Sequence, residues 1–291
     1  MPAGHTAVVG ASGFIGSALA ARLQHLGEPA SSFTRQSPPL RPDGRLAQGI
    51  ADARAVVWAA ASINPSIAES RPDLVEADLG ALRTMLLALR AEGSRARVVM
   101  LSSGGTVYDP DEAPPFSEDS RCVPKGAYGR SKLAAEALVS SLADDAVVVR
   151  VANAYGPGQP VAPGQGVIAH WLQAIRDDLP VTVYGSLETA RDYVHVDDIV
   201  SALLAVTDAA VPPPVVNIGS GTSTTLRDLL HLVESVVGPF ATLHEQSRAF
   251  DVSRSWLDIS LAGRTLSWQP AVDLRQGIAS MWHADQVPHG D

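Results

Sequence analysis

The strongest constraint on the fold is a run of three evenly spaced glycines near the start of the chain. Gly10, Gly13 and Gly16 follow an apolar, strand-like segment at 5–10 and open an Ala/Leu-rich segment with helical spacing at 14–26. Glycine adopts the backbone conformations of a tight turn and lets the backbone approach another group closely. A strand, a glycine turn and a helix in this order predict the first unit of a parallel sheet covered by helices.

The rest of the first half repeats this alternation of strand and helix. Further strands are expected at 29–34, 55–58, 97–102 and 146–151, and helices at 73–90 and 125–142. Parallel strands need a crossover connection between them, and a helix usually provides it. The pattern therefore predicts an α/β protein with a Rossmann-type, doubly wound parallel sheet.

The second half has shorter and more dispersed elements, which follow a Gly/Pro-rich loop at 156–166. Its expected helices are 167–176, 196–207 and 226–237, and its expected strands are 181–184, 191–195 and 215–218, with shorter pieces up to Met281. We interpret residues 1–155 as one domain, to which residues 191–218 return. Residues 156–190 and 219–291 are expected to form a smaller lobe that closes over a site.

Composition and charge exclude several classes of protein. The 291 residues carry a formal net charge of −9 and no Lys/Arg run, which disfavours binding to nucleic acid. Cys122 is the single cysteine, so no disulfide framework and no cysteine-rich metal site can form. No apolar run approaches the ~18 residues of a membrane span, and no signal peptide is evident. We therefore expect a cytoplasmic protein without a membrane or nucleic-acid partner.

The glycine turn also predicts a phosphate-binding site. At the start of a helix, free N–H groups and the positive end of the helix dipole face any anion. The spacing G-x-x-G-x-x-G, placed between a strand and a helix, is typical of a dinucleotide-binding turn. The expected contacts come from the turn and the first helical residues, namely Gly10, Ser12, Gly13, Phe14, Ile15 and Gly16.

The end of the second strand indicates which dinucleotide binds. An acidic residue there usually bonds the ribose hydroxyls of NAD, but this chain has Thr34 followed by Arg35. A hydroxyl and a guanidinium suit a 2′-phosphate, because arginine can form two parallel hydrogen bonds to it. We therefore expect NADPH as the cofactor, with NAD as the alternative. In the simpler interpretation, Arg35 is a solvated loop residue.

Tyr128 and Lys132 are the candidate catalytic pair. They are four residues apart on the predicted helix at 125–142, so their side chains share a face. A neighbouring ammonium stabilises a phenolate, and tyrosine can then act as general acid toward a carbonyl oxygen or as base in the reverse direction. The lysine can also bond the nicotinamide ribose. Together with the glycine turn, the pair predicts hydride transfer at a carbonyl or an alcohol.

Hydroxyl groups follow the fourth predicted strand. The carboxyl ends of parallel strands face the ligand crevice, so Ser103 can share the substrate oxygen with Tyr128. Ser102 is expected beside the cofactor, and Gly104 and Thr106 beside the substrate. In the alternative interpretation, these residues only close the strand and cover a turn.

With several later segments, these features resemble the extended short-chain dehydrogenase/reductase family of nucleotide-sugar epimerases, dehydratases and reductases. Residues 57–61 resemble the family's cofactor-contacting third strand, and residues 266–270 its C-terminal signature. Residues 150–157 and 191–198 resemble the two segments that bind the substrate diphosphate, and residues 164–168 the nucleotide-pocket loop. The resemblance extends over nearly the whole chain.

The resemblance assigns roles to particular residues. It implies that the N-terminal lobe binds the dinucleotide, with contacts from Ala59 and Ala60, and that the C-terminal lobe binds a nucleoside-diphosphate sugar. The substrate-binding residues that it implies are Asn153, Gly166, Val167, Tyr184 and Arg191. It also implies a homodimer formed through the helices at 73–90 and 125–142.

Two departures from the family pattern bear on the reaction. Gly104 stands where the epimerases and dehydratases have a catalytic Ser or Thr, so that role passes to Ser103. Thr34-Arg35 replaces the acidic residue, which favours a reductase that exchanges NADPH over an enzyme that retains NAD. We therefore expect reduction at C4 of a 4-keto-6-deoxy sugar carried on dTDP or a related nucleotide. The alternatives are an NAD-dependent nucleotide-sugar 4-epimerase and a non-catalytic dinucleotide sensor.

No metal site is expected. His195 and Asp197-Asp198 lack a third ligand at a suitable spacing, so we interpret them as the end of a strand and the cap of the next helix.

Overall fold

A six-stranded sheet forms the centre of the computed structural model, which describes residues 4–246 and 253–284. The strand order is β10-β5-β4-β3-β1-β2, and all neighbours are parallel. The strands are β1 Thr6–Val9, β2 Ala30–Phe33, β3 Ala55–Trp58, β4 Arg97–Ser103, β5 Ala146–Val151 and β10 Val215–Ile218. The predicted Rossmann-type, doubly wound parallel sheet is confirmed.

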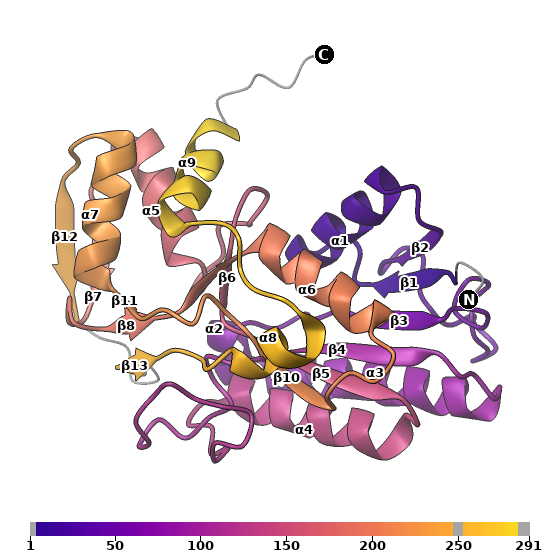
Figure 1. Ribbon diagram of the computed structural model, residues 1–291. Helices are drawn as coiled ribbons and strands as arrows, with labels where there is room; N and C mark the ends of the chain where they lie inside the picture. Colours follow the sequence, from indigo (N-terminus) through magenta and orange to yellow (C-terminus); the bar gives the residue numbers. More distant parts are fainter. Residues whose placement is uncertain (1–3, 247–252, 285–291) are drawn as a thin grey trace.

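Helices cover both faces of this sheet because its central strands are apolar on both sides. Val8 and Val57 pack on one face against α1 Phe14–His25, α6 Val196–Asp208 and α8 Ser260–Leu266. Ala7 and Val56, their neighbours in the chain, pack on the other face against α3 Pro72–Ala91 and α4 Ala127–Leu142. Alternate residues of a strand point to opposite faces, so a continuous apolar strand needs two covering layers. Figure 1 shows the sheet between these two sets of helices.

The C-terminal elements form a second apolar core beside the sheet (Figure 1). Its helices are α5 Val167–Arg176, α7 Leu226–Val237 and α9 Leu274–Ala284, and its two-stranded sheet pairs β7 Val181–Tyr184 with β12 Thr242–Glu245. Trp171 is 2% exposed at the centre of this core, where its Nε1 donates to the carbonyl of Thr182 at 2.9 Å. The amphipathic spacing of α5 and α7 produces this core, since each helix places its apolar stripe against the others.

The structure differs from the sequence prediction at residues 191–195. The expected strand is divided at Asp192 into β8 Ala190–Arg191 and β9 Tyr193–His195. β8 pairs with β11 Thr224–Thr225 and β13 Arg254–Ser255, whereas β9 pairs with β6 Asn153–Tyr155. The strand is interrupted because Asp192 is buried and polar. Its carboxylate accepts the N–H groups of Ser220 and Gly221 in a loop.

A short helix, α2 Pro65–Ser70, was also not predicted. It begins at a side-chain cap, since Asn64 Oδ1 accepts the N–H of Ile67 at 2.8 Å. Pro65 at its first position suits the start of a helix. In the part of the chain that the structure describes, no helix combines the length and the apolar character that a membrane crossing requires.

Candidate active site

The glycine turn after β1 is tight and lies close against neighbouring backbone. Gly10 has a φ of +92°, and a Cβ built on it would lie 2.6 Å from the backbone nitrogen of Ala60. Only glycine permits both that conformation and that approach. The N–H groups of Gly10 and Ala11 donate to the carbonyl of Phe33 at 2.9 and 3.0 Å, which ties the turn to the end of β2.

The start of α1 can accept a phosphate. Gly13 is its N-cap and contributes no side-chain cap, and the first turn carries no acidic residue. The first N–H groups of a helix have no acceptor within the helix, so they are available to an anion at this end of the helix. The predicted contacts from Gly13 to Gly16 surround the same end, and Ile15 lines the large cavity described below. These residues fit a pyrophosphate.

Thr34 and Arg35 lie directly after β2, beside this turn. Thr34 Oγ1 accepts the N–H groups of Gln36 at 3.2 Å and Ser37 at 3.3 Å, so its hydroxyl shapes the loop. Arg35 is exposed and forms no salt bridge within the described residues. The structure therefore leaves the guanidinium available at the edge of the predicted cofactor site.

A cavity of about 870 Å³ lies between the carboxyl ends of the sheet strands and the C-terminal lobe. Residues from both halves of the chain line it, which places the cavity where an open parallel sheet usually binds its ligand. Of the predicted site residues, it collects Ile15, Ser102, Ser103, Thr106, Tyr128, Asn153, Gly166, Val167, Tyr184 and Arg191.

Tyr128 and Lys132 meet as the spacing on α4 predicts. The Lys132 Nζ lies 5.4 Å from the centre of the Tyr128 ring and donates to the carbonyl of Leu101 at 3.2 Å. A Cβ added at Gly129 would overlap the carbonyl of Thr106, so glycine allows this turn of α4 to approach the loop after β4. Tyr128 lines the cavity, whereas Lys132 is not among the lining residues and lies against the tyrosine ring.

The residues that follow Ser102 have different surroundings. Ser103 and Thr106 line the cavity. Gly104 is not among the lining residues, because a side chain there would point at Leu257, whose Cδ1 would lie 2.6 Å from an added Cβ. Leu257 thus occupies the space that a larger residue at position 104 would require. The geometry therefore favours Ser103, rather than a residue at position 104, as the source of the hydroxyl that would contact the substrate oxygen.

A buried polar network beneath the cavity was missed by the sequence reasoning. Arg150 on β5 forms two hydrogen bonds to Glu136 on α4, at 3.1 and 2.7 Å, and Ser102 donates its hydroxyl to the same carboxylate. Arg150 also donates to the Tyr108 hydroxyl at 3.2 Å, and that hydroxyl donates to Asn217 at 2.6 Å. Burial raises the pKa of Tyr108 to about 12, so its phenol stays neutral. The visible signal was a single arginine in the otherwise apolar strand 146–151.

The predicted substrate residues belong to several elements. Asn153 opens β6, and its Nδ2 donates to the carbonyl of Asp192 at 2.9 Å. Arg191 closes β8, and Tyr184 closes β7 and is 43% exposed. Gly166 has a φ of +77° and is the N-cap of α5, which Val167 begins. These residues form the C-terminal wall of the cavity.

Asp192 is a second residue that the sequence reasoning missed. It is 1% exposed, and its carboxylate accepts the N–H and the hydroxyl of Ser220, each at 2.7 Å, and the N–H groups of Gly221 and Leu257 at 3.2 and 3.3 Å. Burial raises the pKa of this carboxyl, whereas the hydrogen bonds from Ser220 act to lower it. The residue fixes two loops around Arg191, its neighbour in the wall of the cavity.

His195 ends β9 and caps α6, as predicted, whereas Asp198 does not cap that helix and instead bonds a distant loop. His195 Nδ1 accepts the N–H of Asp197 at 3.2 Å and caps α6, and Asp198 accepts the N–H groups of Ala271 and Val272. Burial lowers the pKa of His195, which keeps Nδ1 free to accept. Within the described residues, no group of three His, Cys, Asp or Glu side chains is placed to hold a metal ion.

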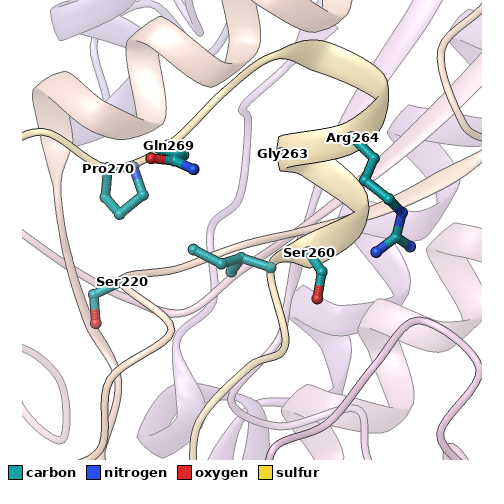
Figure 2. Close-up of a pocket in the computed structure, with 7 residues that line it drawn as sticks. Ser220, Ser260, Gly263, Arg264, Gln269 and Pro270 are labelled. Carbon is teal, nitrogen blue, oxygen red and sulfur yellow. The ribbon is translucent and has the colours of Figure 1, made fainter.

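A second cleft, of about 490 Å³, lies beside α8 (Figure 2). Its lining contains Ser220, Ser260, Arg264 and Gln269. The two hydroxyls already have acceptors, because Ser220 donates to Asp192 and Ser260 donates to Asp258. None of the predicted site residues lines this cleft, whereas ten of them line the cavity of about 870 Å³, so that cavity is the candidate active site.

Comparison with known proteins places the chain in a family. Residues 6–219 match the model of the NAD dependent epimerase/dehydratase family. The chain is 34% identical over 197 residues to a dTDP-4-dehydro-6-deoxyglucose reductase of Escherichia coli, a match that spans 64% of this chain and 60% of the relative. It is 32% identical to a UDP-glucose 4-epimerase of Mycolicibacterium smegmatis, over 94% of this chain and 96% of the relative. It is 30% identical to a dTDP-6-deoxy-L-talose 4-dehydrogenase (NAD(P)(+)) of Kitasatospora kifunensis, over 99% of both chains.

Solved structures agree with this placement. A UDP-glucose 4-epimerase of Thermotoga maritima, solved with UDP-glucose, has a TM-score of 0.86 and 25% identity, covering 97% of this chain and 98% of that chain. A UDP-glucose 4-epimerase of Thermus thermophilus, solved with NAD, has a TM-score of 0.83 and 27% identity, covering 98% and 99%. The chain therefore belongs to the NAD-dependent epimerase/dehydratase family, of the extended short-chain dehydrogenase/reductase type that its motifs resemble, and is an NAD(P)-dependent nucleotide-sugar enzyme.

Proposed function

We propose that this protein reduces the C4 ketone of a nucleoside-diphosphate 4-keto-6-deoxy sugar, with NADPH as the reductant. The observation that carries the proposal is the single cavity that Tyr128 lines together with the predicted diphosphate-binding residues Asn153 and Arg191. Two of the relatives described above have names that refer to dTDP-linked 6-deoxy sugars and to chemistry at C4. Residues 1–155 and 191–218 would form the domain that holds the dinucleotide. The remaining C-terminal residues, together with Asn153 and Arg191 of that domain, would hold the sugar nucleotide.

The residues of the site have distinct roles in this reaction. When bound, NADPH supplies the hydride for C4 of the sugar. Tyr128 gives its phenolic proton to the carbonyl oxygen, so that the ketone becomes an alcohol and the tyrosine becomes a phenolate. The Lys132 ammonium, which lies over the Tyr128 ring, stabilises the phenolate and would also bond the ribose of the cofactor. Ser103 donates its hydroxyl to the same carbonyl oxygen and polarises it.

A direct assay tests this proposal. The purified enzyme is mixed with NADPH and a dTDP-4-keto-6-deoxyhexose, and NADPH absorbance and the sugar product are followed. We expect one NADPH consumed for each 4-hydroxy sugar formed. Tightly held NAD on the purified protein, interconversion of UDP-glucose and UDP-galactose, and no net use of NADPH would contradict the reductase.

The second candidate is a nucleotide-sugar 4-epimerase with NAD. The specific observation in its favour is the match to the Mycolicibacterium smegmatis UDP-glucose 4-epimerase, which covers almost all of both chains. Thr34 and Arg35 at the end of β2 favour the reductase, because the epimerase has no need for a 2′-phosphate contact. A cytoplasmic location remains a prediction. A homodimer formed through α3 and α4 also remains a prediction, and Leu87 on α3 is 45% exposed.

Replacing Arg35 with alanine is expected to raise the KM for NADPH about 10- to 100-fold, because a charge-assisted hydrogen bond contributes about 1.5–3 kcal/mol. The KM for NADH should change less than about twofold, since NADH has no 2′-phosphate. Arg45→Ala is the control, because Arg45 is also exposed and lies further along the chain. Initial rates over a range of each cofactor give the comparison. Equal effects on NADPH and NADH would reject the 2′-phosphate contact.

A further inference from the structure

The helix α2 contacts a loop that forms part of the cavity wall. Its N-cap residue Asn64 is 6% exposed, and the Nδ2 of Asn64 donates to the carbonyl of Pro163 at 3.2 Å. Pro163 belongs to the Gly/Pro-rich loop at 156–166 and lines the cavity, as do Pro65 and Ser66 in the first turn of α2. One end of α2 is therefore fixed to the substrate side of the candidate site.

The other end of α2 contacts the helix that carries Tyr128. Glu69 Oε1 accepts the N–H of Ala127 at 2.6 Å, and Ala127 is the first residue of α4. The α4 helix has no cap of its own, because its N-cap is Gly126 and its first turn carries no acidic residue. A Cβ added to Gly126 would lie 3.0 Å from Glu69 Oε1, so glycine leaves space for the carboxylate. Glu69 thus supplies both the hydrogen-bond acceptor and the negative charge that favour a helix start.

We propose that Glu69 is a positioning residue for the reaction, acting through Tyr128. Its carboxylate holds the first turn of α4, and α2 connects that turn to the 156–166 loop through Asn64. The unpaired N–H groups of a first turn allow it to fray, and a general acid misplaced by about 1 Å loses up to about 100-fold in rate. The inference rests on the proposed role of Tyr128 and adds the residue that fixes its position.

The test compares substitutions of Glu69 in the intact enzyme. Glu69→Ala is expected to lower kcat about 10- to 100-fold, with the KM values for NADPH and for the sugar nucleotide within about twofold of the original, because Glu69 does not line the cavity. Glu69→Gln should recover most of the kcat, since the amide oxygen still accepts the Ala127 N–H. Glu76→Ala is the matched control, because Glu76 is an exposed glutamate on the neighbouring helix α3.

Hydrogen–deuterium exchange gives a readout that does not depend on activity. The amides of residues 127–130 should exchange faster in Glu69→Ala than in the original chain, and their exchange should be unchanged in Glu76→Ala. Original kcat and original exchange in Glu69→Ala would overturn the positioning role, as would faster exchange over the whole chain. If Tyr128→Phe is inactive while Glu69→Ala behaves as the original, only the positioning role fails. Full activity of Tyr128→Phe would overturn both this inference and the proposed chemistry.

Discussion

Replacing Tyr128 with phenylalanine is expected to lower kcat between about 100- and 10,000-fold, the usual contribution of a positioned general acid. The substitution removes one oxygen and leaves the ring, so the cavity wall and the contact with Lys132 are preserved. Binding of NADPH, measured by the change in cofactor fluorescence, should stay within about twofold. Tyr128 lines the cavity, and the Lys132 ammonium lies against its ring.

The lysines offer a matched pair of variants for the same prediction. Lys132→Met should reduce kcat and also weaken binding of NADPH, because Lys132 is proposed to serve both the phenol and the ribose. Lys125→Met is the control, since Lys125 lies just before the same helix and pairs with Asp111 at the surface. Original turnover in both Tyr128→Phe and Lys132→Met, with cofactor still bound, would favour the non-catalytic dinucleotide sensor.

The second large effect is expected from the buried ion pair between Glu136 and Arg150. Their side chains are 9% and 7% exposed, and Glu136→Gln leaves the arginine charge without its partner. Removing one member of a buried pair costs about 3–5 kcal/mol of unfolding free energy. Urea unfolding followed by tryptophan fluorescence measures this loss. The effect is on stability, because the pair holds α4 to β5 beneath the cavity and touches neither predicted ligand.

Two further variants make this prediction specific. Glu188→Gln breaks the exposed pair with Arg227, whose side chains are 70% and 52% exposed, and should cost less than about 1 kcal/mol. Replacing both Glu136 and Arg150 with methionine removes the two charges together, so it should cost less than Glu136→Gln alone. A loss for Glu136→Gln no larger than that for Glu188→Gln would show that the buried pair is not a stabilising contact.

The sequence was sufficient for the sheet because its signals are local. The predicted strands at 55–58, 146–151 and 215–218 agree with β3, β5 and β10, since a continuous apolar strand is buried in any parallel sheet. The relation of Tyr128 to Lys132 follows from the periodicity of a single helix. The family resemblance rests on the glycine turn and the tyrosine–lysine pair together with several later segments, and the comparisons with known proteins confirm it.

Contacts between distant segments could not be predicted in this way. Asp192 appeared to lie within a strand, but its carboxylate bonds residues 28 and 65 positions further along the chain. Leu257 covers Gly104, and neither residue carries a local signal of that contact. Such pairs depend on how the two lobes pack.

The sequence by itself determined the fold class and the tyrosine–lysine pair, because repeated short-range patterns of apolar residues, glycines and charges specify local structure. The family came from the resemblance of its motifs, taken in their order along the chain. Only the tertiary structure decided what surrounds that pair. It placed Ser103 in the cavity wall and Gly104 beneath Leu257, and it brought Glu69 from another helix to the first N–H of α4. The physical reason is that a side chain's hydrogen-bond partner is set by its position in space, and in a folded chain that partner often lies far away in sequence.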